Sequence, residues 1–179
     1  IYQLRAELCD IRPLIWRRLL VRAQATVSDL HRVLQVAFGW YDEHLHRFEI
    51  LGQDYGEYRE GGPMYSTDAT KVRLSTLGLG SGDCLVYEYD FGDLWVHEIE
   101  VEDVLADLGA NKTYPRCSAG RGVAPPEDCG GPLAAMQRYR RRAGRSSRFL
   151  DDDWDVDVDF DDDLDGESSD ESIRNRDGF

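Results

Sequence analysis

Apolar and polar residues alternate in two short stretches at the start of the chain. The segments IYQLRAELC (1–9) and LIWRRLLVRA (14–23) show the period-two pattern that is typical of strands. The intervening DIRP, with Pro13, favours a turn. Because the connection is short, we expect the two strands to pair. A third strand is predicted in HLHRFEIL (44–51), where His44, His46, Phe48 and Ile50 would share one face.

A helical period replaces this alternation in TVSDLHRVLQVAFGW (26–40). The apolar positions Leu30, Val33, Leu34, Ala37 and Phe38 fall on one helical face. Ser28 is the expected N-cap, Asp29 suits the first turn, and Gly39 is expected to end the helix. His31 lies beside the apolar face and is interpreted as a residue of the helix surface.

Two further strands are predicted at 84–90 and 94–101, joined by a two-residue turn at Phe91 and Gly92. In this register Asp90 opposes Asp93, and two opposed carboxylates repel each other. A cation, a shared proton or a nearby Arg would relieve the repulsion; alternatively, each Asp side chain bonds turn backbone. The same register places a polar set on one face: Glu88, Asp90, Asp93, Trp95 and His97.

The remaining segments complete the predicted architecture. Residues 52–70 and 111–132 are rich in Gly, Pro and polar residues and are predicted loops, whereas 133–150 is a basic helix candidate. The order of elements favours an α+β fold with a β-grasp-like mixed sheet, one main packing helix, an extra C-terminal β-hairpin and a disordered acidic tail. The expected division is an α+β domain (1–135), a basic helix or linker (136–150) and an acidic low-complexity tail (151–179).

Charge is distributed unevenly along the chain. The net charge is −14 over 179 residues, and residues 151–179 carry 14 acidic and 2 basic side chains, or −12, which leaves about −2 for the rest. A nearly neutral domain disfavours non-specific nucleic-acid binding, which needs a cationic surface. The sequence shows neither a long apolar run nor a signal-peptide pattern, so we expect no membrane partner and a cytoplasmic location.

Several residue types point to metal chemistry. Two imidazoles spaced as His44 and His46 can converge on one ion, such as zinc, with His97 and Asp90 as further ligands. The alternative is that one His caps the strand start and the other packs against an aromatic ring. The predicted pocket combines the two strands and a stiff Pro-rich loop, and its residues are His44, His46, Asp90, Asp93, Trp95, His97, Glu127 and Asp128.

The four cysteines are expected to be reduced thiols, because a chain of this size does not need disulfides to fold. Cys117 and Cys129 remain a possible metal or redox pair. Their separation by eleven residues differs from the CxxC spacing of zinc ribbons.

Four segments together resemble one known family. IRPLIWRRLLV, LHRVLQVAFGWYDEHLHRFEI, YEYDFGDLWVHEIEVE and YPRCSAGRGVAPPEDCGGP are similar, in this order, to the plasmid pRi ORF-three-like family, whose members include TnpR-labelled passenger proteins of insertion elements. The resemblance runs from Tyr2 to Pro132, after which the chain is expected to depart from the family. It implies a prokaryotic α+β protein of plasmids or mobile elements, without an established activity. The residues offer no support for a resolvase.

Two functional hypotheses follow. The first is a non-enzymatic accessory or interaction domain of a plasmid or transposable element, with a protein partner. The second is a small metal-dependent hydrolase or nuclease that uses His44, His46 and His97 as ligands and Asp90 or Asp93 as a ligand or general base.

Overall fold

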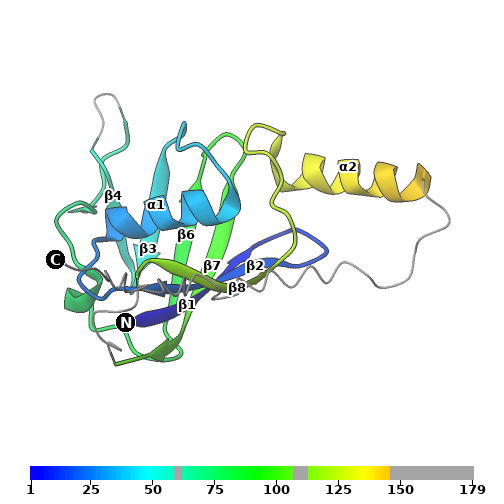
Figure 1. Cartoon of the computed structure of the whole chain (residues 1–179). Helices are drawn as coiled ribbons and strands as arrows, with labels where there is room; N and C mark the ends of the chain where they lie inside the picture. Colours follow the sequence, from blue (N-terminus) through cyan, green and yellow to red (C-terminus); the bar gives the residue numbers. More distant parts are fainter. Residues whose placement is uncertain (59–61, 107–112, 146–179) are drawn as a thin grey trace, which may run out of the picture.

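The computed structural model describes residues 1–58, 62–106 and 113–145, and it has an α+β architecture (Figure 1), as the sequence predicts. The elements are β1 (Tyr2–Leu8), β2 (Ile15–Val21), α1 (Val27–Phe38), β3 (His46–Ile50), β4 (Gln53–Gly56), β5 (Thr67–Asp68), a 3₁₀ turn η1 (Leu74–Thr76), β6 (Cys84–Tyr89), β7 (Trp95–Val104), β8 (Arg116–Arg121) and α2 (Gly131–Arg145). None of the helices in these residues is long and apolar enough to span a bilayer.

A single mixed sheet of eight strands forms the body, in the order β5-β4-β3-β6-β7-β1-β2-β8. All neighbours pair antiparallel except β4 and β5. The N-terminal hairpin β1–β2 leads into α1, which lies across one face of the sheet (Figure 1). The β6–β7 hairpin lies in the centre of the sheet, not at an edge, because β7 pairs with β1 while β6 pairs with β3.

Helix α1 presents the predicted apolar face to the sheet, and Leu30, Leu34 and Phe38 are buried. Its N-cap is Thr26, not Ser28. The Thr26 side chain accepts the Asp29 N–H while the Asp29 carboxylate accepts the Thr26 N–H, which forms a capping box. Ser28 instead donates to Glu57. Gly39 ends the helix with φ +75°, as expected.

Two segments predicted as loops contain strands. Residues 53–56 and 67–68 form β4 and β5, and β8 lies within the Gly- and Pro-rich stretch before α2. These strands are short and polar: β4 pairs with the preceding β3, β5 pairs with β4, and β8 pairs with the distant β2, so the local pattern does not reveal them. Helix α2 begins at Gly131 and runs across position 135, where the sequence analysis places a domain boundary.

The predicted two-residue turn of the β6–β7 hairpin is wrong, because the real connection is longer. The strands are joined by the five residues 90–94, and both Asp90 (φ +55°) and Leu94 (φ +56°) have left-handed backbone. Tyr89 therefore pairs with Trp95 and Tyr87 with His97. The pairing register of β6 and β7 is thus shifted by one residue from the predicted one. Because such a shift exchanges the two faces of a strand, His97 points into the core together with Tyr87.

Candidate functional site

A cluster of aromatic and imidazole rings fills the space between α1 and strands β3, β6 and β7. The rings of His31 and His46 stack at 3.5 Å with an interplanar angle of 8°. Trp40 stacks on Tyr89 at 5.3 Å. His31 is 1% exposed, so its interpretation as a surface residue is wrong. The members of this ring cluster are His31, Phe38, Trp40, His46, Tyr87, Tyr89, Trp95 and His97.

His31 links a surface carboxylate to a buried phenol. Its Nε2 lies 2.8 Å from Asp42 Oδ1, and its Nδ1 lies 2.8 Å from the Tyr87 hydroxyl. Gln35 donates to the same hydroxyl at 2.9 Å and accepts the Asp42 N–H through its Oε1. Burial raises the pKa of Tyr87 well above its usual value. Tyr87 therefore stays neutral and serves as a hydrogen-bonding group, not as a nucleophile.

His97 is enclosed completely by apolar rings. Phe38 contacts its ring edge-on at 4.5 Å, and Trp40 and Tyr87 lie 5.3 Å away. Burial lowers the pKa of His97 to about 3. The side chain is thus neutral near pH 7 and has no route to a ligand at the surface.

Glu127 connects the Pro-rich loop to the ring cluster. Its carboxylate accepts hydrogen bonds from the Tyr89 hydroxyl and from the Tyr41 N–H, and its main-chain carbonyl accepts the Trp95 indole N–H at 2.9 Å. Trp95 is fully buried. Burial raises the pKa of Tyr89, with the Glu127 contact as a second cause. Glu127 and Trp95 therefore anchor the loop to the ring cluster.

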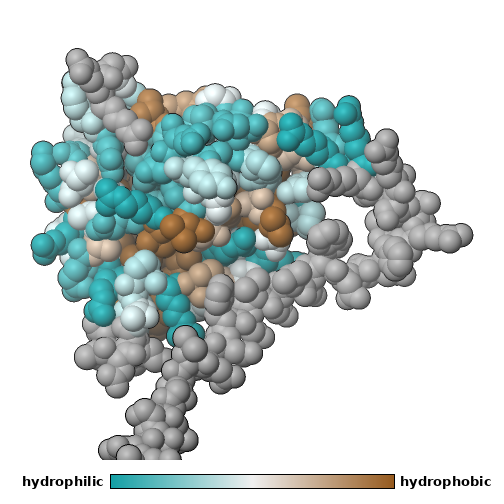
Figure 2. Space-filling view, turned by 45° about the horizontal axis from the view of Figure 1, so that its top comes forward, coloured by the Kyte–Doolittle hydropathy of each residue, from teal (hydrophilic) through white to brown (hydrophobic). Residues whose placement is uncertain are grey.

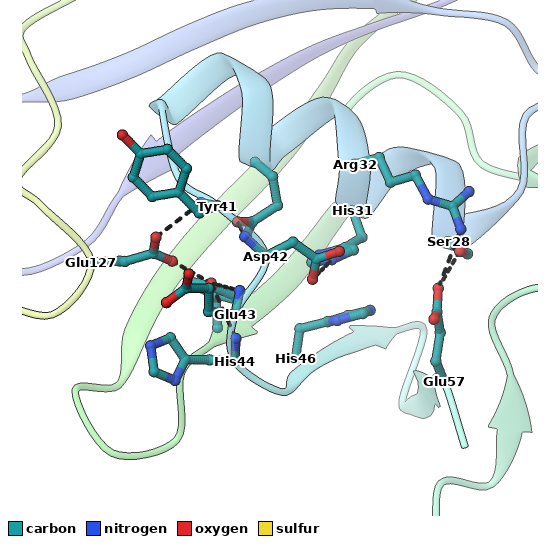
Figure 3. Close-up of polar contacts among 12 residues, drawn as sticks. Ser28, His31, Arg32, Tyr41, Asp42, Glu43, His44, His46, Glu57 and Glu127 are labelled. Atoms are coloured by element: carbon teal, nitrogen blue, oxygen red, sulfur yellow. Dashed lines mark hydrogen bonds and ion pairs between the residues drawn. The ribbon is translucent and has the colours of Figure 1, made fainter. Parts of the chain in front are cut away.

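His44 lies between two carboxylates at the end of the sheet. Its Nε2 is 2.8 Å from Asp128 Oδ1, and its Nδ1 is 3.7 Å from Asp90 Oδ1. Figure 3 shows the side chains of His44 and His46 leaving the chain in different directions. The reason is that His44 precedes β3, which begins at His46, so strand periodicity does not apply to it.

Asp90 and Asp93 do not oppose each other, because the connection is longer than predicted. The Asp90 carboxylate accepts the Gly92 N–H at 3.0 Å, and the Asp93 carboxylate accepts the Gly130 N–H at 2.8 Å. The turn-backbone alternative therefore describes Asp90, whereas Asp93 fastens the loop that precedes α2.

Among the residues that the structure describes, two groups of side chains have metal-ligand composition. One is His31, Asp42 and His46; the other is His44, Asp90 and Asp128, and in each the ligand atoms lie within 4.8 Å of one another. The structure thus brings the pocket candidates His44, Asp90 and Asp128 together, places His46 in the other group, and assigns His97 to neither. His31 and Asp42 were not anticipated. Asp42 could have been considered as a ligand from the sequence, because it lies close to the two predicted histidines His44 and His46.

The four cysteines are free thiols. Cys117 lies in β8 and Cys129 in the loop before α2, and burial raises the pKa of both thiols. Neither belongs to the two groups described above, and their role as a metal or redox pair stays a prediction.

An apolar groove of about 420 Å³ lies beside the first turns of α1, at the end of β2 and just before β8. Figure 2 shows brown, apolar surface surrounded by teal, polar residues on the face that this view presents. Arg22 and Arg32 lie at the groove, together with Asp29, to which Arg32 is paired at 3.1 Å. The groove is lined by Val21, Arg22, Gln24, Ala25, Asp29, Arg32, Val33, Tyr114 and Pro115.

Comparison with known proteins places the chain among relatives of unknown activity. The family model described as "Plasmid pRiA4b ORF-3-like protein" matches residues 1–162. The match continues beyond Pro132, so the expected departure from the family at that residue is wrong. An uncharacterized protein, y4hQ, of Sinorhizobium fredii is 35% identical over 136 residues, which cover 74% of this chain and 68% of the relative.

A solved structure shares the fold. The crystal structure of a protein of unknown function, MM3350, from Methanosarcina mazei Go1 has a TM-score of 0.67 and 32% sequence identity to this chain. The similarity covers 87% of this chain and 91% of that protein.

Proposed function

The chain belongs to the plasmid pRiA4b ORF-3-like family, and from that premise we propose that it is a cytoplasmic interaction domain of a plasmid or transposable element rather than an enzyme. The observation that carries the proposal is the position of the apolar groove next to the edge strand β8. Together they offer one continuous surface to an extended protein segment.

Strand β8 supports this proposal because it is an edge strand of the sheet. It is the last strand in the sheet order and pairs with β2 on one side within the described part of the chain. Edge strands present main-chain donors and acceptors to an added strand. Its central residues Ser118, Ala119 and Gly120 are small, so a partner backbone can approach closely.

The position and the chemistry of the groove also support the proposed interaction domain. Tyr114 and Pro115 line the groove and directly precede Arg116, the first residue of β8. A segment paired along β8 would therefore reach the groove with an apolar side chain. Main-chain hydrogen bonds supply affinity in this recognition mode, and side-chain pockets supply specificity.

Charge indicates the composition of the partner. Arg22 and Arg32 lie at the groove, and Arg116 and Arg121 begin and end β8. Asp29 is the one carboxylate of the groove lining, and it belongs to the capping box of α1. Cationic side chains on both parts of the surface fit a partner segment that combines carboxylates with apolar side chains. We therefore expect a protein segment of alternating acidic and apolar residues.

The test uses the full chain and a fluorescein-labelled nine-residue peptide of alternating Glu and Val. Binding is measured by fluorescence anisotropy. The variant Val33→Asp places a charge in the groove, and Val36→Asp is its matched control on the same helix, at a position that is 83% exposed and does not line the groove. We expect Val33→Asp to weaken binding about tenfold or more, or ~1.4 kcal/mol, and Val36→Asp to leave it unchanged.

Two results would count against the proposal. One is absence of peptide binding to the unmodified chain. The other is an equal loss of binding in both variants, which would indicate a general charge effect instead of a groove contact. A peptide of the same composition with all Glu residues at one end tests whether alternation matters.

A metal-dependent hydrolase is the second candidate, and the convergence of His44, Asp90 and Asp128 favours it. It ranks second because the groove is lined by other residues. Metal-stimulated hydrolysis of bis-p-nitrophenyl phosphate that is lost in Asp128→Asn would support the enzyme. Equal rates in both proteins would exclude this site as its source.

A further inference from the structure

We propose that His44, Asp90 and Asp128 bind one divalent transition-metal ion of the zinc class. The inference concerns a different surface from the partner groove and does not depend on it. The His44 ring lies 2.8 Å from the Asp128 carboxylate and 3.7 Å from the Asp90 carboxylate. Asp90 faces Nδ1 of the His44 ring and Asp128 faces Nε2, so a shared ion would use one of these nitrogens, and the carboxylate beside the other nitrogen would turn toward it. Ligand atoms of all three residues lie within 4.8 Å of one another, which keeps this movement local to the side chains.

Asp90 is positioned by its backbone and by a hydrogen bond. It follows β6 directly and has φ +55°. Its Oδ1 accepts the Gly92 N–H at 3.0 Å, and its side chain is 10% exposed. Such outer contacts fix the orientation of a ligand carboxylate before the ion arrives.

Asp128 is exposed, but the residue before it is held firmly. Glu127 accepts hydrogen bonds from Tyr89, Tyr41 and Trp95, so the backbone that carries Asp128 is attached to the core. On the other side, the Gly130 N–H donates to Asp93 at 2.8 Å. An exposed carboxylate on an anchored loop lets an ion enter from solvent without rearrangement of the fold.

The donor set fits a borderline metal. One imidazole nitrogen and two carboxylate oxygens suit Zn²⁺, Mn²⁺ or Co²⁺ better than Ca²⁺ and Mg²⁺, which prefer oxygen ligands alone. Within the described residues, His44 is the one basic side chain that pairs with Asp90 or Asp128. A divalent ion would neutralise both carboxylates. Three protein ligands leave a coordination position for water.

The second group, His31, Asp42 and His46, is less suited to an ion. An imidazole coordinates a metal in the plane of its ring, but the two rings are stacked 3.5 Å apart and almost parallel. Their in-plane lone pairs run side by side instead of meeting at a point. Both nitrogens of the buried His31 also bond Tyr87 and Asp42, whereas the His44 side chain is 30% exposed, so its ring can turn toward an ion. Metal binding there would require the ring cluster to break open.

The experiment titrates the full chain with Zn²⁺ by isothermal calorimetry and with Co²⁺ by visible absorption. We expect one equivalent of tight binding and a Co²⁺ spectrum of a nitrogen- and oxygen-ligated ion. Asp128→Asn and His44→Gln should each weaken Zn²⁺ binding by more than about 100-fold, above the 10–100-fold that is typical for loss of an outer contact. Asp128 is exposed, so its variant is expected to fold, which circular dichroism checks.

Two control variants make the result specific. Glu43→Gln removes an exposed charge next to His44 and should bind Zn²⁺ as the unmodified chain does. Asp42→Asn alters the second group and should also leave binding unchanged. The proposal fails if the full chain binds no stoichiometric Zn²⁺, if Asp128→Asn retains full affinity, or if Asp42→Asn abolishes binding. Weak binding by the many acidic residues of 151–179 would appear equally in every variant.

Discussion

At the scale of single residues, His97 shows how far burial changes the chemistry of a side chain. Both ring nitrogens are buried, and a contact with the Tyr87 backbone only partly offsets the effect of burial on the pKa. Its pKa is lowered from 6.5 to about 3 by burial. Between about pH 6.5 and 3, His97 therefore binds a proton in the unfolded chain but not in the folded chain. As a result, the free energy of unfolding is unaffected by His97 above pH 6.5 and decreases as the pH falls through this range.

We expect His97→Leu to reduce this acid sensitivity. Replacement removes the titrating group, so the loss of unfolding free energy between about pH 6 and 4 should become shallower by up to about 1.4 kcal/mol per pH unit. At pH 7 the variant should be as stable as the unmodified protein or more stable, because an apolar side chain replaces a fully buried polar ring. Urea denaturation at several pH values measures both effects. Parallel pH profiles would show that His97 is not excluded from water.

At the scale of elements, α1 joins the ring cluster to the sheet. Its inward side carries polar groups as well as apolar ones, since His31 and Gln35 are buried beside Leu30 and Leu34. The helix therefore both packs the core and supplies hydrogen bonds to Tyr87.

Truncation of Leu34 tests the apolar contribution of this helix. Leu34 is 0% exposed, so Leu34→Ala should cost roughly 2–5 kcal/mol of unfolding free energy. Val36→Ala on the exposed side should change it by less than about 0.5 kcal/mol. Equilibrium denaturation compares the two variants. Similar small effects in both would contradict the packing of α1 on the sheet.

The capping box tests how α1 begins. Thr26→Ala removes the acceptor of the Asp29 N–H and should cost about 1 kcal/mol. Thr26→Ser keeps a hydroxyl at the same place and should retain nearly all of the stability. If chemical denaturation ranks the serine variant with the alanine variant, the hydroxyl is not the stabilising group.

At the scale of the whole molecule, the acidic C-terminal segment is the largest part that the sequence separates from the domain. Residues 151–179 lie outside the described residues, so their predicted disorder rests on sequence alone. The family match reaches residue 162 and thus includes the beginning of this segment.

Removal of residues 151–179 should change the melting temperature by less than about 5 °C. The reason is composition: a segment this acidic and this poor in apolar residues cannot bury enough surface to stabilise a fold. Differential scanning calorimetry at a fixed salt concentration gives the comparison. A larger fall would mean that Trp154 or Phe160 contributes to the packed domain.

The sequence by itself determined the elements whose pattern is local. The alternation in residues 2–8 and 15–21 and the helical period of α1 each follow from neighbours a few residues apart, and the structure confirms all three. The three proposed metal ligands His44, Asp90 and Asp128 are all among the pocket residues predicted from residue type and position, and that they bind an ion stays a prediction.

Only the tertiary structure decided the register of the central hairpin, the pairing of β8 and the partners of each histidine. Left-handed backbone at Asp90 and Leu94 lengthens the turn, and this single shift moves His97 into the core. Asp128 meets His44 across more than eighty residues because the loop is fastened to Trp95 and Tyr89. Such contacts depend on which strands become neighbours in the sheet, and strand order is selected by burial of the whole core, which no local pattern of residues specifies.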